Sequence, residues 1–381
     1  MNKHFYNHLF IALAMDSASC FVSCDDDDDI INDRPVEDNR SIVVIYDNDV
    51  HCAIEGYAKM AGYRDAIVEA DTAWVATVSA GDYLQGGAVG SMTKGQSVID
   101  VIKEVGYDAI TLGNHEFDYK VPRMLELTKK LSAPVVCANL TDHVTGKQVF
   151  SSYVIKQLGR KKVAFVGLLT PSTVNSESYA FYDDAGNRTY DIEDENLNSL
   201  VQKAVDAARS EGADFVILLS HMGHLKDSCL STSETVIQGT TGIDVVIDGH
   251  THTVLYGSMV QNAAGQKVLL TQTGSKFRNV GKLTISKKGE IKSECLSTEY
   301  MTYSSSKVQK AIDDVLAKCE GLMESKIAYS AFPLSIAEDG RRIVRSRESN
   351  LGELIPDAFR ITTGTGRPYE RRRHQCLNPG R

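Results

Sequence analysis

The most informative stretch of the chain reads Tyr107-Asp108-Ala109-Ile110-Thr111-Leu112-Gly113-Asn114-His115-Glu116-Phe117-Asp118. Its first half, residues 107–112, is short and largely apolar, which predicts a buried strand. Its second half places amide, imidazole and carboxylate groups directly after that strand. Because loops at strand ends in α/β sheets meet on a rigid frame, this segment predicts part of a ligand site.

Four further segments repeat this arrangement of metal-type ligands directly after a predicted strand. One such segment alone is more often a turn with a satisfied histidine than a metal site. Five of them within one domain are much harder to explain as separate accidents. The predicted strands cover residues 41–46, 72–78, 215–219 and 245–247, and the segments are Asp49-Val50-His51, Gly81-Asp82, Ser220-His221-Met222-Gly223-His224 and Gly249-His250-Thr251-His252.

Strands and helices alternate along most of the chain before strands follow one another directly. Apolar residues at helical spacing predict helices over residues 97–105, 122–131 and 197–210. Further strands are predicted over residues 134–137, 162–169, 268–271 and 281–285. This order favours an α/β layered sandwich of mixed sheets.

The residue types in these segments suit a pair of divalent cations. Two ions about 3.5–4 Å apart need a bridging carboxylate together with imidazole and oxygen ligands. Asp82 is the natural bridge, because the glycine beside it lets the backbone and the ions approach closely. Asn114 adds a neutral carbonyl oxygen, so the ions stay strongly Lewis acidic. Such a ligand set suits manganese, iron, zinc or cobalt better than calcium.

In this order the five segments resemble the calcineurin-like metallophosphoesterases, and among these the bacterial 5′-nucleotidases most closely. The resemblance runs from about Ser41 to Arg360, and it implies a four-layer α/β/β/α sandwich over residues 41–303. It also implies which residues hold the metals. One ion takes Asp49, His51 and His252, the other takes Asn114, His221 and His250, and Asp82 bridges both.

The resemblance further implies a catalytic pair that does not touch the metals. His115 stabilises or protonates the leaving oxygen, and Asp118 orients its ring and raises its basicity. We assign His224 a supporting or surface role and Glu116 a structural role. Cys52, beside a ligand, is interpreted as packing.

The composition is that of a globular protein, and its acidic net charge argues against a nucleic-acid-binding surface. Hydrophobic residues make up 42% and charged residues 24% of the 381 residues, and the net charge is −9. The eight cysteines include no CxxC pair, so neither a zinc knuckle nor a disulfide is predicted.

The N-terminus has the pattern of an export signal. Lys3 and His4 precede a short apolar run over residues 9–15, and small residues and cysteines follow. Residues 1–24 resemble a bacterial lipoprotein signal with Cys24 as the lipidated residue, and residues 25–40 form an acidic tether. Processing at Cys20, or a plain secretory signal, are the alternatives. The expected location is the periplasm or the cell surface, with the lipid as the only membrane contact.

The C-terminal part changes character after residue 303. A helical stripe of apolar residues predicts a linker helix in residues 304–330, and residues 331–363 resemble the opening of the family's nucleotide-binding domain. The basic tail over residues 364–381 departs from that pattern. Its segment Glu-Arg-Arg-Arg-His-Gln can be written GAA CGG CGG CGG CAT CAG, which read from the second base gives Asn-Gly-Gly-Gly-Ile. A frameshift near Gly364 is therefore our hypothesis, and a natural basic tail is the alternative.

The predicted function is hydrolysis of nucleoside 5′-monophosphates by two divalent cations. The alternatives are a 2′,3′-cyclic-nucleotide phosphodiesterase or nucleotide-sugar hydrolase with the same ions, or a non-catalytic surface lipoprotein that binds metal or nucleotide. An off-metal imidazole with its own carboxylate favours catalysis, since binding alone does not need it. No substrate-binding residues are assigned, because the resemblance places them in the domain that this chain does not continue.

Overall fold

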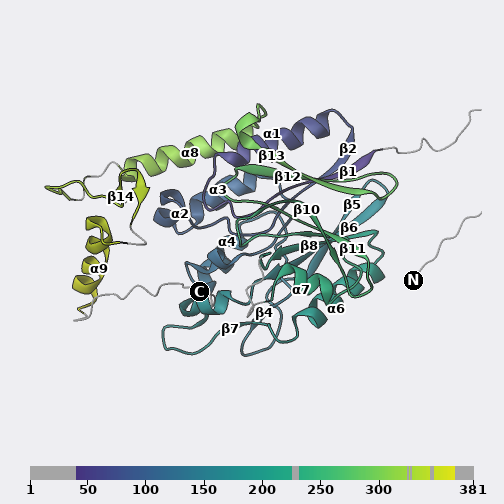
Figure 1. Cartoon of the computed structure of the whole chain (residues 1–381), viewed down its shortest axis with the longest axis horizontal. Coiled ribbons are helices and arrows are strands. Elements are labelled where there is room, and N and C mark those ends of the chain that lie inside the picture. The colour runs from purple at the N-terminus through teal and green to yellow at the C-terminus, as the bar shows by residue number, and fades with distance from the viewer. Residues whose placement is uncertain (1–39, 225–230, 324–325, 327, 344–346, 365–381) are drawn as a thin grey trace, which may run out of the picture.

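The computed structural model describes residues 40–224, 231–323, 326, 328–343 and 347–364. Its body consists of two stacked sheets with helices on both outer faces. Figure 1 shows α1 and α8 above the strands and α6 and α7 below them. The expected four-layer α/β/β/α sandwich is thereby confirmed.

The first sheet has the strand order β13-β12-β1-β2-β3. Its strands β1, β2 and β3 are parallel, with Val43 opposite Val75, and β12 and β13 extend the sheet in antiparallel fashion. Near-continuous apolar runs such as Ile42 to Tyr46 form these strands because both faces are covered. The bounds are β1 (Ser41–Asp47), β2 (Ala73–Ser79), β3 (Ala109–Ile110), β12 (Asn279–Ile285) and β13 (Ile291–Ser297).

The second sheet has the order β10-β11-β9-β8-β6-β5. Its four central strands are parallel, with Ile217 opposite both Phe165 and Val245, and β10 and β5 close its edges as antiparallel strands. The bounds are β5 (Tyr153–Leu158), β6 (Lys161–Leu169), β8 (Phe215–His221), β9 (Val245–Ile247), β10 (Val254–Gln261) and β11 (Lys267–Thr273).

Three hydrophobic layers hold the sandwich together. The first sheet packs against α1 (Gly56–Glu69), α3 (Gln96–Val105) and α8 (Ser306–Met323), and the inner faces of the two sheets form the middle layer. The second sheet packs against α6 (Leu197–Ser210) and α7 (Ser233–Gln238). The remaining short elements are α2 (Ala88–Thr93), α4 (Val121–Thr128), β4 (Leu140–Asp142), α5 (Thr173–Ser176) and β7 (Tyr190–Ile192).

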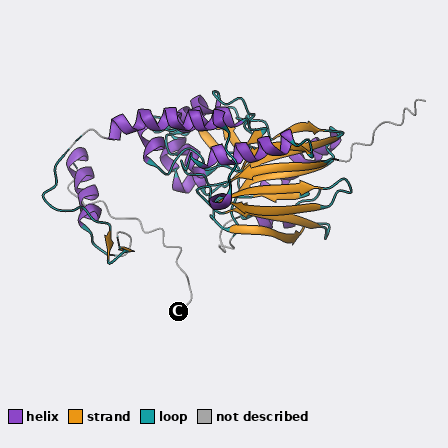
Figure 2. Ribbon diagram, turned by 90° about the horizontal axis from the view of Figure 1, so that it is seen from above, coloured by secondary structure: helices purple, strands orange, loops and turns teal. Residues whose placement is uncertain are grey.

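The C-terminal elements stand apart from this body. Figure 2 shows the last helix, α9 (Asn350–Thr363), and the hairpin of β14 (Ala337–Glu338) and β15 (Arg341–Arg342) away from the stacked sheets. By contrast, α8 is part of the body, because Val308, Ile312 and Cys319 are buried against the first helical layer. No helix within the described ranges is long and apolar enough to span a membrane.

Several local expectations were wrong or incomplete. The predicted strand at 134–137 makes only isolated bridges through Val135 and Val136, and the predicted strand at 107–112 is reduced to β3. Helix α1 and the antiparallel strands β5, β10 and β13 were not predicted at all. The export signal with Cys20 and Cys24, the acidic tether up to residue 39, and the tail from residue 365 lie outside the described residues.

Candidate metal centre

The predicted ligand segments meet at the carboxyl ends of the strands. Asp49 and His51 follow β1, Asp82 follows β2, and His221 is the last residue of β8. His250 and His252 follow β9, and Asn114 opens a short 3₁₀ helix (Asn114–Phe117) after β3. The parallel strands of both sheets therefore bring together side chains that are up to 203 positions apart in the sequence.

The backbone around the site is strained at its ligands. Asp49, His51, Asp82, His250 and His252 have positive φ angles between 47° and 75°. Residues other than glycine rarely adopt a positive φ angle, and the backbone strain that results is most common at functional sites. These residues lie in tight turns at the carboxyl ends of the strands.

Glycines allow the loops to approach one another closely. A Cβ on Gly81, whose φ is +91°, would lie 2.4 Å from the backbone nitrogen of Gly113. A Cβ on Gly113 would lie 2.2 Å from Oδ1 of Asp82. The two loops can therefore touch only where neither carries a side chain, and this contact fixes the position of Asp82.

One group of ligands surrounds a space suited to a single cation. Ligand atoms of Asp49, His51, Asp82 and His252 all lie within 4.8 Å of one another. Nε2 of His51 lies 2.9 Å from Nε2 of His252, and Nε2 of His252 lies 3.4 Å from Oδ1 of Asp49. The Nδ1 atom of His51 faces the carbonyl oxygen of Gln85 at 3.0 Å, so Nδ1 carries the proton and Nε2 presents its lone pair.

The second group lies on the other side of Asp82. Oδ2 of Asp82 is 3.1 Å from Nε2 of His221 and 3.8 Å from Nε2 of His51. Oδ1 of Asp82 accepts a hydrogen bond from the backbone N–H of His115 at 2.9 Å. Oδ1 of Asn114 lies 3.0 Å from Nδ1 of His250. Asp82 thus stands between the two halves of the predicted ligand set.

His221 gives the clearest sign that the site fits cations. Its Nδ1 faces the carbonyl oxygen of Ala80 at 2.6 Å, so in the neutral ring the lone pair belongs to Nε2. That Nε2 is buried, and within the described part of the chain it forms no hydrogen bond of good geometry, although it lies 3.1 Å from Oδ2 of Asp82. Such an atom is costly to bury unless a ligand completes it, and a cation between it and Asp82 would satisfy both groups.

Electrostatics in the cluster favour positive charge. Burial would raise the pKa of Asp82, but His221, His115 and His51 hold it well below its usual range. Burial would lower the pKa of His221, but the charge of Asp82 raises this pKa to about 10. Burial and the neighbouring His221 lower the pKa of His250 to about 4. The site therefore attracts a positive charge and also contains an imidazole that stays neutral, as metal ligation requires.

Polar groups behind the ligands hold them in place. The buried carboxylate of Glu116 accepts the backbone N–H groups of Asp82, Tyr83, Leu84 and Gly113 at 2.6–3.1 Å. Asn48 donates to Oδ2 of Asp49 at 2.6 Å. Glu116 therefore organises the loop around Asp82, which confirms its structural role.

His115 and Asp118 form the predicted pair beside this cluster. Nδ1 of His115 lies 3.1 Å from both carboxylate oxygens of Asp118, and the His115 ring is 5.2 Å from the ring of His51. Burial opposes protonation, but the hydrogen bond to Asp118 and the charge of Asp82 raise the pKa of His115 to about 9. The ring is therefore protonated at neutral pH and adjoins the cluster without joining it.

The match to a protein-family model agrees with the geometry of the site. Residues 44–254, more than half of the chain, match the family described as calcineurin-like phosphoesterase. The chain belongs to the calcineurin-like phosphoesterases.

Relatives of this phosphoesterase include several nucleotidases. The chain is 27% identical over 365 residues to the snake venom 5′-nucleotidase of Gloydius brevicauda, which covers 83% of this chain and 58% of the relative. It is 29% identical over 239 residues to the 5′-nucleotidase of Bos taurus, over 56% of this chain and 38% of the relative. The chain thus spans less than two thirds of these curated relatives.

Solved structures show the same fold. The crystal structure of a 5′-nucleotidase precursor from Thermus thermophilus superposes with a TM-score of 0.67 at 26% identity. The superposition covers 85% of this chain and 68% of the other. As a calcineurin-like phosphoesterase, the chain carries an aspartate and histidine site of the binuclear type, and its residues fit two divalent cations.

The phosphoesterase site contains one acidic residue that the sequence analysis missed. Glu177 lies with His115 and Asp118 in a group whose polar atoms are within 4.8 Å of one another. Burial and the charge of Asp118 raise the pKa of Glu177 to about 7. The hydroxyl of Tyr179 donates to the carbonyl oxygen of Asp118 at 2.6 Å. Glu177 follows α5 and no strand, so strand-end motifs could not identify it.

Two other residues near the phosphoesterase site take the roles expected of them. His224 pairs with Glu234 and belongs to neither group of potential ligands in the part of the chain that the structure describes. Cys52 donates its thiol to the carbonyl oxygen of Leu84 at 3.1 Å. Burial raises the pKa of Cys52 to about 11, so it remains a thiol that packs beside the site.

Proposed function

We propose that this phosphoesterase releases phosphate from nucleoside 5′-monophosphates with two divalent cations. The observation that carries the proposal is the position of Oδ2 of Asp82 between Nε2 of His51 and the buried Nε2 of His221. The substrate is proposed from relatives named 5′-nucleotidase, which are longer than this chain.

In this proposal each ligand keeps the role assigned from the sequence. Asp49, His51 and His252 would hold one cation, and Asn114, His221 and His250 would hold the other. Asp82 would be the ligand shared by both, and the backbone N–H of His115 holds its Oδ1 in place. When bound, such a pair of ions supplies Lewis acidity and a nucleophile at neutral pH.

The remaining chemistry belongs to His115 and Asp118. The protonated ring of His115 donates a proton to the leaving oxygen of the ester. Without this proton the oxygen would depart as an alkoxide, which is a poor leaving group. Asp118 holds Nδ1 of the ring at 3.1 Å, so Nε2 is the nitrogen that faces the substrate. A protein that only binds metal or nucleotide does not need this pair, so catalysis is favoured over a binding role.

Export and lipid attachment form the outer part of the proposal. Several relatives carry names such as snake venom 5′-nucleotidase. We extend this to an exported protein anchored through Cys24, with the periplasm or cell surface as its location. Incorporation of labelled fatty acid should disappear in Cys24→Ala and persist in Cys20→Ala, and the opposite pattern would assign processing to Cys20.

The activity is tested by phosphate release from AMP and from p-nitrophenyl phosphate, with manganese and with chelator. Manganese-dependent release from the artificial ester is expected, because its leaving group needs little recognition. Release from AMP is expected to be weak when nucleoside recognition lies outside the chain. No release from either ester with any of manganese, zinc, iron or cobalt would contradict the proposal.

A further inference from the structure

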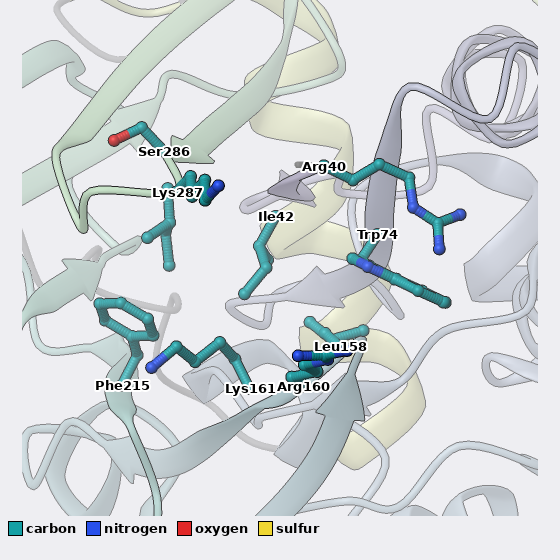
Figure 3. Close-up of a pocket in the computed structure, with 10 residues that line it drawn as sticks. Arg40, Ile42, Trp74, Leu158, Arg160, Lys161, Phe215, Ser286 and Lys287 are labelled. Carbon is teal, nitrogen blue, oxygen red and sulfur yellow. The ribbon is translucent and has the colours of Figure 1, made fainter. Parts of the chain in front are cut away.

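The opposite end of the sandwich contains a cavity that the phosphoesterase chemistry does not use. Figure 3 shows it around Ile42, between Trp74 on one side and Phe215 on the other. The cavity lies at the start of β1, β2, β6 and β8, whereas the metal ligands follow the ends of the parallel strands. Strand β1, from Ser41 to Asp47, spans about 20 Å at roughly 3.3 Å per residue and separates the two ends. We call this hollow the basal cavity, lined by Arg40, Ile42, Trp74, Leu158, Arg160, Lys161, Phe215, Ile285, Ser286 and Lys287.

The floor of the basal cavity is an open end of the hydrophobic layer between the two sheets. Ile42, Leu158 and Ile285 are buried at its base, and Trp74 and Phe215 pack partly exposed against the same layer. Its volume is about 270 Å³, close to the lower limit of about 300 Å³ for small-molecule sites. Displacement of water from an apolar cavity of this size by an apolar group is thermodynamically favourable.

The rim of the basal cavity has a single sign of charge. All four ionisable residues that line it are cationic, although the chain carries a net charge of −9. The guanidinium of Arg40 stacks 3.8 Å from the ring of Trp74. Arg40 and Lys161 also form ion pairs with Asp71 and Asp214, and neither aspartate is part of the lining. Figure 3 shows the side chain of Lys161 extended toward Phe215, so positive charge borders the apolar floor.

We propose that the basal cavity binds a small amphiphilic anion, with its apolar group on the floor and its carboxylate or phosphate at the cationic rim. A purely ionic ligand would leave the floor solvated, and a neutral apolar ligand would make no use of the positive rim. The same chemistry occurs in a free acyl anion and in an anionic phospholipid. The experiment distinguishes these two sources.

The chain provides its own reporter, because Trp74 is its single tryptophan and lines the cavity. The full chain, loaded with manganese, is titrated with decanoate below its micelle concentration while tryptophan fluorescence is recorded. A saturable change is expected. Decanol should bind at least tenfold more weakly, and decyltrimethylammonium should give no saturable change. A response of equal strength to decanol, or no saturable response to decanoate, would overturn the proposal.

Charge reversal locates the site. Arg160→Glu combined with Lys287→Glu should weaken decanoate binding at least tenfold, and Lys147→Glu, an exposed lysine outside the cavity, should leave it unchanged. If the double variant and Lys147→Glu bound decanoate with equal affinity, the proposal would be overturned, provided that their thermal unfolding midpoints match that of the parent chain.

Vesicles of phosphatidylglycerol and of phosphatidylcholine then distinguish the two sources of the anion. Binding to the anionic vesicles that the double variant abolishes assigns the anion to a membrane lipid, and binding of decanoate alone assigns it to a free acyl anion.

Discussion

At the scale of the residue, His221 explains why the site needs cations. Its ring lies fully buried, with Nδ1 against a backbone carbonyl oxygen and Nε2 3.1 Å from Asp82 but, among the described residues, without a hydrogen bond of good geometry. Histidine and aspartate at this distance form an ion pair in the absence of metal, and a divalent cation replaces the shared proton when it binds. The same side chain would therefore stabilise the fold without metal and serve as a ligand in the proposed centre.

Replacing His115 tests the division between binding and catalysis. His115→Asn should keep metal affinity, because His115 adjoins the ligands only through its backbone and its ring edge. Turnover should fall by roughly two to four orders of magnitude, as expected for loss of a general acid. Steady-state hydrolysis of AMP, whose leaving group is an alkoxide, and manganese titration measure both quantities. The exposed His143 serves as control, and an unchanged rate in His115→Asn would show that the ring is not catalytic.

Glu177 should make stability depend on pH. Its pKa rises to about 7 in the fold, so its contribution to stability is complete below the unfolded pKa and declines as pH rises to about 7. Glu177→Gln should remove this decline, which amounts to about 1 kcal/mol after allowing for the partial exposure of the group. Urea unfolding in chelator at several pH values measures it. A variant that retains the parent's full pH dependence would assign the decline to another group.

The candidate metal ligands could be predicted from the sequence, whereas the neighbouring residue Glu177 could not. Asp49, His51 and Asp82 stand in short segments directly after strands, so their convergence follows from strand direction alone. Glu177 reaches the site from a loop whose course depends on tertiary packing. A single sequence gives no periodic signal for such a position.

At the scale of the element, the site depends on close contact between the turns after β2 and β3. Gly81→Ala should cost roughly 2–4 kcal/mol, because a positive φ and a collision with Gly113 add together. Gly186→Ala is the matched control, since its φ of +84° is similar and nothing lies within 4 Å of the added Cβ. It should cost roughly 1 kcal/mol. Urea unfolding of both variants gives the difference, and equal costs would show that the loops can separate freely.

Sequence patterns predicted the elements that are buried on both faces. The apolar runs of β1, β2, β6, β8 and β9 identify them without reference to neighbours. Helix α1 has two glycines and no clear apolar stripe, so its helical state comes from packing against α8 and the first sheet. The edge strands β10 and β13 are partly exposed, and they form because a paired neighbour is available.

At the scale of the whole molecule, helix α8 packs into the body although it lies beyond the boundary predicted at residue 303. Helix α8 contributes Val308, Ile312 and Val315 to the first helical layer. We therefore expect Ile312→Ala to destabilise the entire body by roughly 2–4 kcal/mol. Thermal unfolding compared with the exposed-face control Asp313→Ala measures this cost. A loss no larger than that of the control would mean that α8 is a separable linker.

The sandwich places two different environments at its two ends. The proposed metal ligands lie where the parallel strands end, and the cationic basal cavity opens where these strands start. A layered α/β sandwich was foreseeable from the order of elements and its four layers from the family resemblance, whereas the basal cavity was not. Its lining comes from strand ends and turns that have no motif in common.

The most direct test of the account counts the bound cations. Manganese bound per chain at equilibrium should reach two in the parent protein at neutral pH, because Asp82 stands between two ligand groups. Asp82→Asn should bind at least tenfold more weakly at one or both sites, while His143→Asn should still bind two. A parent chain that binds one ion or none, or an Asp82→Asn variant that binds two with unchanged affinity, would contradict a two-cation phosphoesterase centre.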